Sequence, residues 1–173
     1  MSFNVAKIEE IKQQARRHID RGALTDGYRA DAKEITQLLN DALATELVCI
    51  LRYKNHHDMA MGLNAEPVAA EFLEHANDEQ RHADMLAKRI TQLNGTPNYS
   101  PVGLAERSHT HYVECNSLGE MIKENLIAER IAVDIYKEVI QYVGDTDPTT
   151  RVMLENILKD EEEHADDLAN ILQ

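Results

Sequence analysis

The sequence predicts an all-α protein built around a four-helix bundle with one long crossover connection, because three features agree. The 173 residues include only seven glycines and four prolines, with no tryptophan and few β-branched runs, which leaves little material for sheets. Apolar side chains recur at helical spacing through four long stretches. These stretches are joined in the order short loop, long crossover, short loop, which is the connectivity of a bundle with one crossover.

A short amphipathic helix is predicted ahead of the bundle, over residues 4–21. Asn4 can cap its start and Gly22 can end it. Its apolar stripe consists of Ile8, Ile11, Ala15 and Ile19. We therefore divide the chain into an N-terminal helical extension, residues 1–28, and the bundle, residues 29–173. The extension is expected to pack on the outside of the bundle or on a neighbouring subunit.

The four bundle helices are bounded by residues that start and stop helices. They are predicted at residues 31–61, 67–93, 117–143 and from Pro148 onward. Gly62 breaks the first helix, and Pro67 suits the first turn of the second. The crossover, residues 94–116, is too long for a turn and is expected to carry a short helix near residues 104–108.

The net charge of −13 limits the partners of this chain. An acidic surface repels nucleic acid and anionic lipid, so neither is expected to bind, and it attracts metal cations. No apolar run approaches the roughly 18 residues that a membrane span needs. The first residues also lack the apolar core of a secretory signal. We expect a soluble, cytoplasmic protein that does not contact a membrane.

A duplicated pattern of glutamates and histidines links the four long helices. The first copy consists of Glu46, Glu79 and His82, and the second of Glu129, Glu161 and His164. The lone glutamate precedes the Glu-x-x-His pair by 33 positions in the first copy and by 32 in the second. A tyrosine follows each lone glutamate by seven positions, at Tyr53 and Tyr136. The pattern therefore indicates that one helical pair has been used twice.

Helix geometry brings these six side chains to a common centre. Residues three apart on a helix share a face, so the glutamate and the histidine of each pair can both point inward. In each antiparallel pair of helices, the two glutamates lie nearly equally far from the connecting turn. All four helices can therefore contribute a carboxylate at one height of the bundle.

Four buried carboxylates would repel one another unless cations neutralise them, and two divalent ions balance four negative charges. Carboxylate oxygens with one imidazole per metal suit iron or manganese, and we favour two iron ions. The alternative is a solvated helix face rich in glutamate and histidine, since the chain has 31 acidic residues. The doubled spacing favours the metal site.

Several other residues are candidates for a functional role. A third Glu-x-x-His pair, Glu106 and His109, lies in the crossover and has Leu73 in place of an upstream glutamate. We favour a loop-surface role for it, with a role on an entry route for ions as the alternative. His75 and Asp78 line an approach to the centre, are solvated, or contact the metal ligands from outside. The two tyrosines are interpreted as core residues with a satisfied hydroxyl, with electron donation to the metals as the alternative. Glu162 and Glu163 are expected to face solvent.

Two cysteines, Cys49 and Cys115, are too few for a disulfide framework and form no C-x-x-C pattern. Free cysteine usually behaves as a small buried thiol, which is the interpretation we favour. Cys49 lies one turn beyond Glu46, so a redox role near the metals remains the alternative.

The segments 44–53 and 159–164 resemble the first and fourth helices of bacterioferritins, members of the ferritin-like superfamily, and the similarity covers about residues 30–173. The resemblance implies a ferritin-like fold and a ferroxidase centre within one subunit. In this centre Glu79 and Glu161 would bridge two irons, Glu46 and His82 would complete one, and Glu129 and His164 the other. It further implies oxidation of Fe(II) with O2 or H2O2 and storage of ferric mineral in a homo-oligomeric cage.

Three departures from bacterioferritins qualify this resemblance. Gln80 stands where those proteins have a haem-ligating methionine, so haem is not expected. Nine residues follow His164, which leaves no room for a fifth helix. The N-terminal helix and the longer crossover resemble the twelve-subunit Dps-like mini-ferritins, including a group with a cysteine pair. Both 12 and 24 subunits stay open.

Two other functions use the same sequence features. A non-storing di-iron or di-manganese peroxidase, catalase or oxygenase could carry the same centre, although a rubredoxin-like cysteine module is missing for a rubrerythrin. A DNA-coating mini-ferritin is the third hypothesis, and the acidic charge argues against it.

Overall fold

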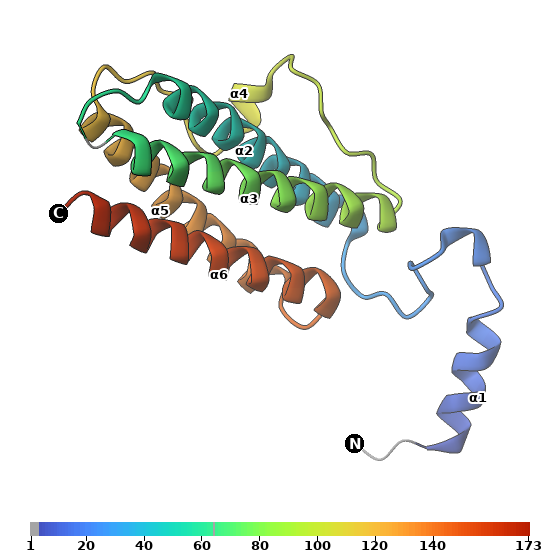
Figure 1. Ribbon diagram of the computed structural model, residues 1–173. Helices are drawn as coiled ribbons and strands as arrows, with labels where there is room; N and C mark the ends of the chain where they lie inside the picture. Colours follow the sequence, from blue (N-terminus) through green and yellow to red (C-terminus); the bar gives the residue numbers. More distant parts are fainter. Residues whose placement is uncertain (1–3, 64) are drawn as a thin grey trace.

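The computed structural model describes residues 4–63 and 65–173, and four long helices dominate it (Figure 1). They are α2 (Ala32–Met59), α3 (Ala65–Gln92), α5 (Leu118–Val143) and α6 (Pro148–Ile171). α2 packs along α3 and α5 along α6, and the two pairs lie against each other. No strand occurs among the described residues, and no helix follows α6 there. The predicted all-α bundle with one crossover is confirmed.

The ends of the bundle helices follow the predicted capping chemistry. Asp31 caps α2 by accepting from the backbone N–H groups of Lys33 and Glu34, and Ser117 caps α5 in the same manner. Gly144 ends α5 at a φ of 50°, a conformation that glycine adopts without strain. α3 begins two residues before the predicted Pro67. The proline still lies in the first turn, where its missing N–H removes no helical hydrogen bond.

The N-terminal extension differs from the prediction of one helix over residues 4–21. α1 (Val5–Gln14) is capped by Asn4 as expected but ends early, and a separate 3-10 turn, η1 (Ile19–Arg21), follows. His18 has a φ of 49° between them, which a continuous α-helix cannot accommodate. α1 extends away from the bundle and contains no buried residue (Figure 1). The expected packing on the subunit's own bundle is therefore wrong for α1, and packing on a neighbour remains a prediction.

The crossover runs along one face of α2 and carries the predicted short helix, α4 (Leu104–Arg107). Polar side chains of α2 hold it at three positions along the helix. Thr45 Oγ1 lies 3.0 Å from His109 Nδ1, and Arg52 Nη1 donates to the His111 carbonyl over 3.0 Å. One turn further, His56 Nε2 lies 3.0 Å from the Val113 carbonyl. Arg52 is 1% exposed, so these contacts satisfy a buried charge that would otherwise be costly.

Two apolar clusters fill the bundle and leave a polar layer between them. One cluster includes Leu43, Ala83, Ala132 and Ile157, and the other includes Cys49, Ala76, Ile122 and Leu168. On each of the four helices, one glutamate of the duplicated motif lies between a residue of one cluster and a residue of the other. The fold therefore places the four glutamates in a layer that apolar packing closes on both sides.

A buried ion pair fixes one end of the bundle. Arg89 on α3 donates through Nη2 to both oxygens of Asp147, at 2.8 and 2.9 Å, and through Nε to Thr150. Asp147 also caps α6 and accepts from the Tyr28 hydroxyl over 2.8 Å. Burial alone would raise the pKa of Asp147, but its hydrogen bonds with Thr150 and Arg89 lower it.

No helix among the described residues combines the length and apolar composition that a membrane span needs.

Replacing Asp147 with alanine is expected to lower the free energy of unfolding by about 3–5 kcal/mol, because Arg89 would then be a buried charge without its partner. Asp31→Ala is the matched control, since Asp31 is also an N-cap but is exposed. Its loss should cost about 1 kcal/mol. Urea unfolding of the metal-free protein measures both, and equal effects would contradict the stabilising role of the ion pair.

Candidate metal centre

The six predicted site residues meet in the polar layer of the bundle, and all six are buried. Glu46 comes from α2 and Glu129 from α5, while α3 and α6 each supply a Glu-x-x-His pair. None of the six is more than 3% exposed. Glutamate is rarely buried without a partner, so a cluster of four such side chains requires a compensating charge.

The ligand atoms divide into two groups that share two carboxylates. One group contains Glu46, Glu79, His82 and Glu161, and the other contains Glu79, Glu129, Glu161 and His164. Within each group, the ligand atoms all lie within 4.8 Å of one another. Glu79 and Glu161 belong to both groups, so these two carboxylates lie between the two sets of candidate ligands.

Buried atoms without hydrogen-bond partners test whether a metal fits here. Among the described residues, seven buried side-chain nitrogen or oxygen atoms lack such a partner, and five of them belong to this cluster. These are Glu79 Oε1, Glu129 Oε2, both oxygens of Glu161 and His164 Nδ1. Each unsatisfied buried acceptor is destabilising. Two cations at the centre would satisfy this set, so the donor chemistry fits metal ions.

Carboxylates and histidines influence one another's protonation strongly in this cluster. Burial, together with the charges of Glu79 and Glu161, raises the pKa of both Glu46 and Glu129. Burial alone would lower the pKa of His164, but the adjacent carboxylates of Glu161 and Glu79, each 3.7 Å from Nδ1, raise it to about 12. The pKa of His82 is raised for the same reason. Without metal, these groups hold protons that cations would displace.

The two tyrosines bind the lone glutamates across the bundle. Tyr53 on α2 donates its hydroxyl proton to Glu129 Oε1 on α5, and Tyr136 on α5 donates to Glu46 Oε1 on α2. Each tyrosine thereby satisfies one carboxylate oxygen and leaves Oε2 facing a histidine Nδ1 of the centre. The predicted satisfied hydroxyls are confirmed, and electron donation remains untested.

Two aspartates orient the histidines, and each aspartate contacts the histidine on the opposite helix of the pair α3 and α6. Asp160 Oδ2 on α6 lies 3.3 Å from His82 Nε2 on α3, and Asp78 Oδ2 on α3 lies 3.3 Å from His164 Nε2 on α6. A carboxylate on the outer nitrogen directs the other nitrogen, Nδ1, toward the centre. The role of Asp160 was not among the predictions from the sequence. An aspartate directly before the glutamate in both Glu-x-x-His pairs was the available signal.

The remaining candidates lie outside the two ligand groups. Glu106 is exposed, and His109 is half-buried against Thr45, in agreement with a structural role in the crossover. Glu162 and Glu163 are exposed as predicted.

Both cysteines are free thiols, with Cys49 buried and Cys115 partly buried. Burial raises the pKa of each, which favours the neutral thiol. The predicted burial is confirmed for Cys49 and only in part for Cys115.

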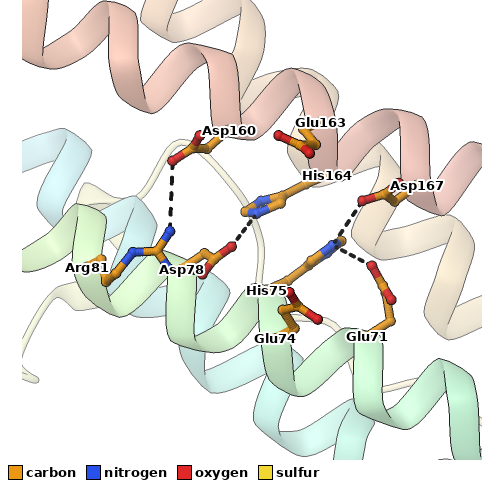
Figure 2. A pocket seen from close by; sticks show the side chains of 9 residues that line it. All are labelled: Glu71, Glu74, His75, Asp78, Arg81, Asp160, Glu163, His164 and Asp167. Atoms are coloured by element: carbon orange, nitrogen blue, oxygen red, sulfur yellow. Dashed lines mark hydrogen bonds and ion pairs between the residues drawn. The ribbon is translucent and has the colours of Figure 1, made fainter.

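An acidic pocket of about 160 Å³ lies between α3 and α6 and reaches the centre at His164 (Figure 2). His75 lies in this pocket and contacts both a ligand of the centre and Tyr53, which the sequence did not predict. Its ring stacks on the His164 ring with 4.1 Å between the centroids, and its Nδ1 lies 3.2 Å from the Tyr53 hydroxyl. His75 and Asp78 both line this pocket, and its use as an approach to the centre stays a prediction.

Comparisons with known proteins agree with this architecture. The model of the ferritin-like domain family matches residues 36–173. Bacterioferritins of Mycobacterium bovis and Mycobacterium tuberculosis are 32% identical over 141 residues, which is 81% of this chain and 84% of theirs. The bacterioferritin of Streptomyces coelicolor is 31% identical over 77% of this chain and 76% of its own.

Solved structures show the same similarity. A dodecameric thioferritin, the bacterioferritin-related protein of Bacteroides fragilis, aligns with a TM-score of 0.80 and 31% identity over 83% of this chain and 87% of its own. Dps from Thermosynechococcus elongatus aligns with a TM-score of 0.78 over 82% of this chain and 91% of its own, and its 18% identity supports the fold alone. The chain therefore belongs to the ferritin-like family.

Proposed function

We propose that this protein is a ferroxidase that oxidises Fe(II) at a dinuclear centre within each subunit and stores the ferric product. The observation that carries the proposal is the pair of ligand groups that share Glu79 and Glu161. Two ions held by common carboxylates can give up two electrons together. Manganese is the alternative metal for the same ligands.

The proposed reaction treats iron as the substrate. Two Fe(II) ions lose one electron each and become Fe(III). The two electrons and two protons convert O2 to H2O2, or convert H2O2 to two molecules of water. Transfer of both electrons in one event avoids the release of a radical product, which is the chemical reason for pairing the ions.

The protein contributes position and charge balance to this reaction. Glu79 and Glu161 hold both ions, and the two histidines each bind one with an orientation set by Asp160 and Asp78. The tyrosine hydroxyls keep Oε1 of Glu46 and Glu129 occupied, so that Oε2 of each can bind a metal. The apolar clusters above and below exclude water, which strengthens the electrostatic interactions within the layer.

Storage in a cage is the second element of the proposal. The similar protein from Bacteroides fragilis is dodecameric, and the similar mycobacterial proteins are bacterioferritins. We propose a homo-oligomer of 12 subunits, with 24 as the alternative, that protects the cytoplasm from Fe(II) and peroxide. Haem is not part of the proposal, since Gln80 is exposed and its Nε2 donates to Asp84.

Glu161→Gln is expected to slow Fe(II) oxidation by roughly 100-fold or more, because it removes a ligand common to both ions. Stopped-flow absorbance of the ferric product measures the initial rate. Glu162→Gln is the control, since Glu162 is adjacent but exposed, and it should oxidise Fe(II) at the wild-type rate. Wild-type rates in Glu161→Gln would refute the assignment of the centre.

The amount of iron that the purified protein retains after Fe(II) oxidation separates storage from simple turnover. A cage should retain far more than about two irons per chain and have the native mass of twelve or 24 subunits. A non-storing peroxidase or oxygenase would keep only its resident pair.

Asp160→Asn and Asp78→Asn are each expected to weaken metal binding by roughly 10–100-fold while the ligands themselves remain. The loss arises because an asparagine holds the outer histidine nitrogen less firmly than a carboxylate does. Calorimetric titration with Zn(II) measures the affinity. Asp166→Asn, an exposed change on α6, should leave it unaltered, and an equal effect of all three variants would disprove the orienting role.

Metal affinity is expected to fall as the pH falls, because Glu46, Glu129, His82 and His164 all have raised pKa values in the metal-free centre. Each group holds its proton to a higher pH than it would in water, so cations must displace protons and lower pH favours the metal-free form. Titration with Zn(II) in buffers of different ionisation enthalpy counts the released protons. An affinity that is constant between about pH 6 and about pH 8 would contradict this expectation.

A further inference from the structure

We propose that Glu71, His75 and Asp167 form a third cation site, separate from the dinuclear centre, that binds one divalent ion in the acidic pocket between α3 and α6. The proposal concerns cation binding and does not depend on ferroxidase activity. That the ion in the cell is Fe(II) rests on the proposed function.

The three side chains converge from two helices (Figure 2). Glu71 and His75 lie four residues apart on α3, and Asp167 faces them from α6. His75 Nε2 is 3.3 Å from Glu71 Oε1 and 3.9 Å from Asp167 Oδ2. One ligand atom from each residue lies within 4.8 Å of the others. Two carboxylates with one imidazole repeat the ligand chemistry of the centre itself.

The hydrogen bonds of Tyr53 determine which nitrogen of His75 faces this cluster with a lone pair. Tyr53 has one hydroxyl proton, which it donates to Glu129. Its oxygen must then accept from His75 Nδ1, 3.2 Å away, so Nδ1 carries a proton. The neutral ring consequently presents the lone pair of Nε2 to two carboxylates. Three acceptors would face one another, and a bound cation satisfies all three.

His75 has the burial and support typical of a metal-binding histidine. It is 2% exposed, although Nε2 is directed into the pocket. A ligating histidine usually donates its second N–H to another protein group, and Tyr53 is such an acceptor for Nδ1. Because Tyr53 also binds Glu129, one hydrogen-bonded chain connects the third site to a ligand of the centre.

The charge of the pocket favours a cation. Its walls contain six carboxylates, those of Glu71, Glu74, Asp78, Asp160, Glu163 and Asp167. Arg81 is the one arginine or lysine in the lining, and it is paired with Asp78. Such an excess of negative charge in a concave site concentrates cations.

The internal duplication shows that the dinuclear centre does not require this triad. Each residue of the centre on α3 corresponds to a residue on α6 that lies 82 positions later, as Glu79 does to Glu161 and His82 to His164. Under the same correspondence, the triad positions Glu71, His75 and Asp167 match Met153, Ile157 and Met85. These three apolar residues belong to or pack against the core. Three polar residues thus occur together at one end of the α3–α6 interface and not at the duplicated positions at the other end, which indicates a function separate from that of the centre.

The location next to the centre suits an ion that is arriving or leaving. The His75 and His164 rings are stacked at 4.1 Å, so the third site adjoins the second ligand group directly. At the other end of the groove between α3 and α6, a pocket is lined by Met85, Met153, Lys88 and Arg89 among others. One end of the groove is acidic and the other is apolar and basic, so cations are drawn to the His75 end.

Anaerobic titration of the full-length protein with Zn(II) tests the proposal, together with anomalous diffraction from crystals grown with Zn(II). Wild type should bind three ions per chain, with one anomalous peak beside His75 Nε2. The double variant E71Q/D167N should lose that peak and bind two ions. E74Q is the matched control, because Glu74 lines the same pocket outside the triad, and it should still bind three.

A variant of the centre separates this proposal from the proposed function. E46Q/E161Q should lose the ions of the centre and keep the peak at His75. Circular dichroism and thermal unfolding verify that each variant is folded. The proposal is overturned if wild type shows no ion at His75, if E71Q/D167N keeps it, or if E71Q/D167N loses the ions of the centre as well.

Discussion

Mutual repulsion among four buried carboxylates is the constraint on which the rest of this structure depends. Two unit charges about 4 Å apart repel by roughly 4 kcal/mol at an effective dielectric constant of about 20. Several such pairs would exceed the entire stability of an ordinary domain, about 5–15 kcal/mol. The fold nevertheless places all four side chains in one layer between two apolar clusters. Cations, or protons in their absence, are therefore required for folding as well as for chemistry.

The contacts around the centre keep the carboxylates able to bind cations. A carboxylate that formed ion pairs with arginine or lysine would be neutralised without metal. Here Glu46 and Glu129 instead accept hydrogen bonds from neutral tyrosine hydroxyls. Asp78 and Asp160 contact the histidines at Nε2, the nitrogen that faces away from the centre. Arg52 and Arg89, the buried arginines, are occupied elsewhere, by the crossover and by Asp147. Charge in the layer is thus left for the ions to balance.

The sequence was sufficient to predict the bundle, its crossover and the six residues that converge. Helical spacing determines which face of a helix a residue occupies, and the duplicated motif determines the height of each glutamate. Contacts between the two helical pairs could not be predicted from the sequence in this way. The tyrosines and aspartates cross from one helical pair to the other, and spacing within a helix does not specify which side chain lies opposite. The sequence also did not predict the positive φ of His18, which prevents one continuous helix over residues 4–21.

Because the two helical pairs are duplicates, a residue that differs between equivalent positions indicates a role outside the shared centre. Two ions between equivalent helical pairs need equivalent ligands, and the glutamates, histidines, tyrosines and aspartates all occur as matched pairs. Passage of ions needs no such equivalence, because one route is sufficient and a second would only weaken the apolar core. The groove between α3 and α6 follows this logic. Its His75 end is lined by six carboxylates, whereas the corresponding positions at the other end are Met85, Met153 and Ile157, which belong to or pack against the apolar core.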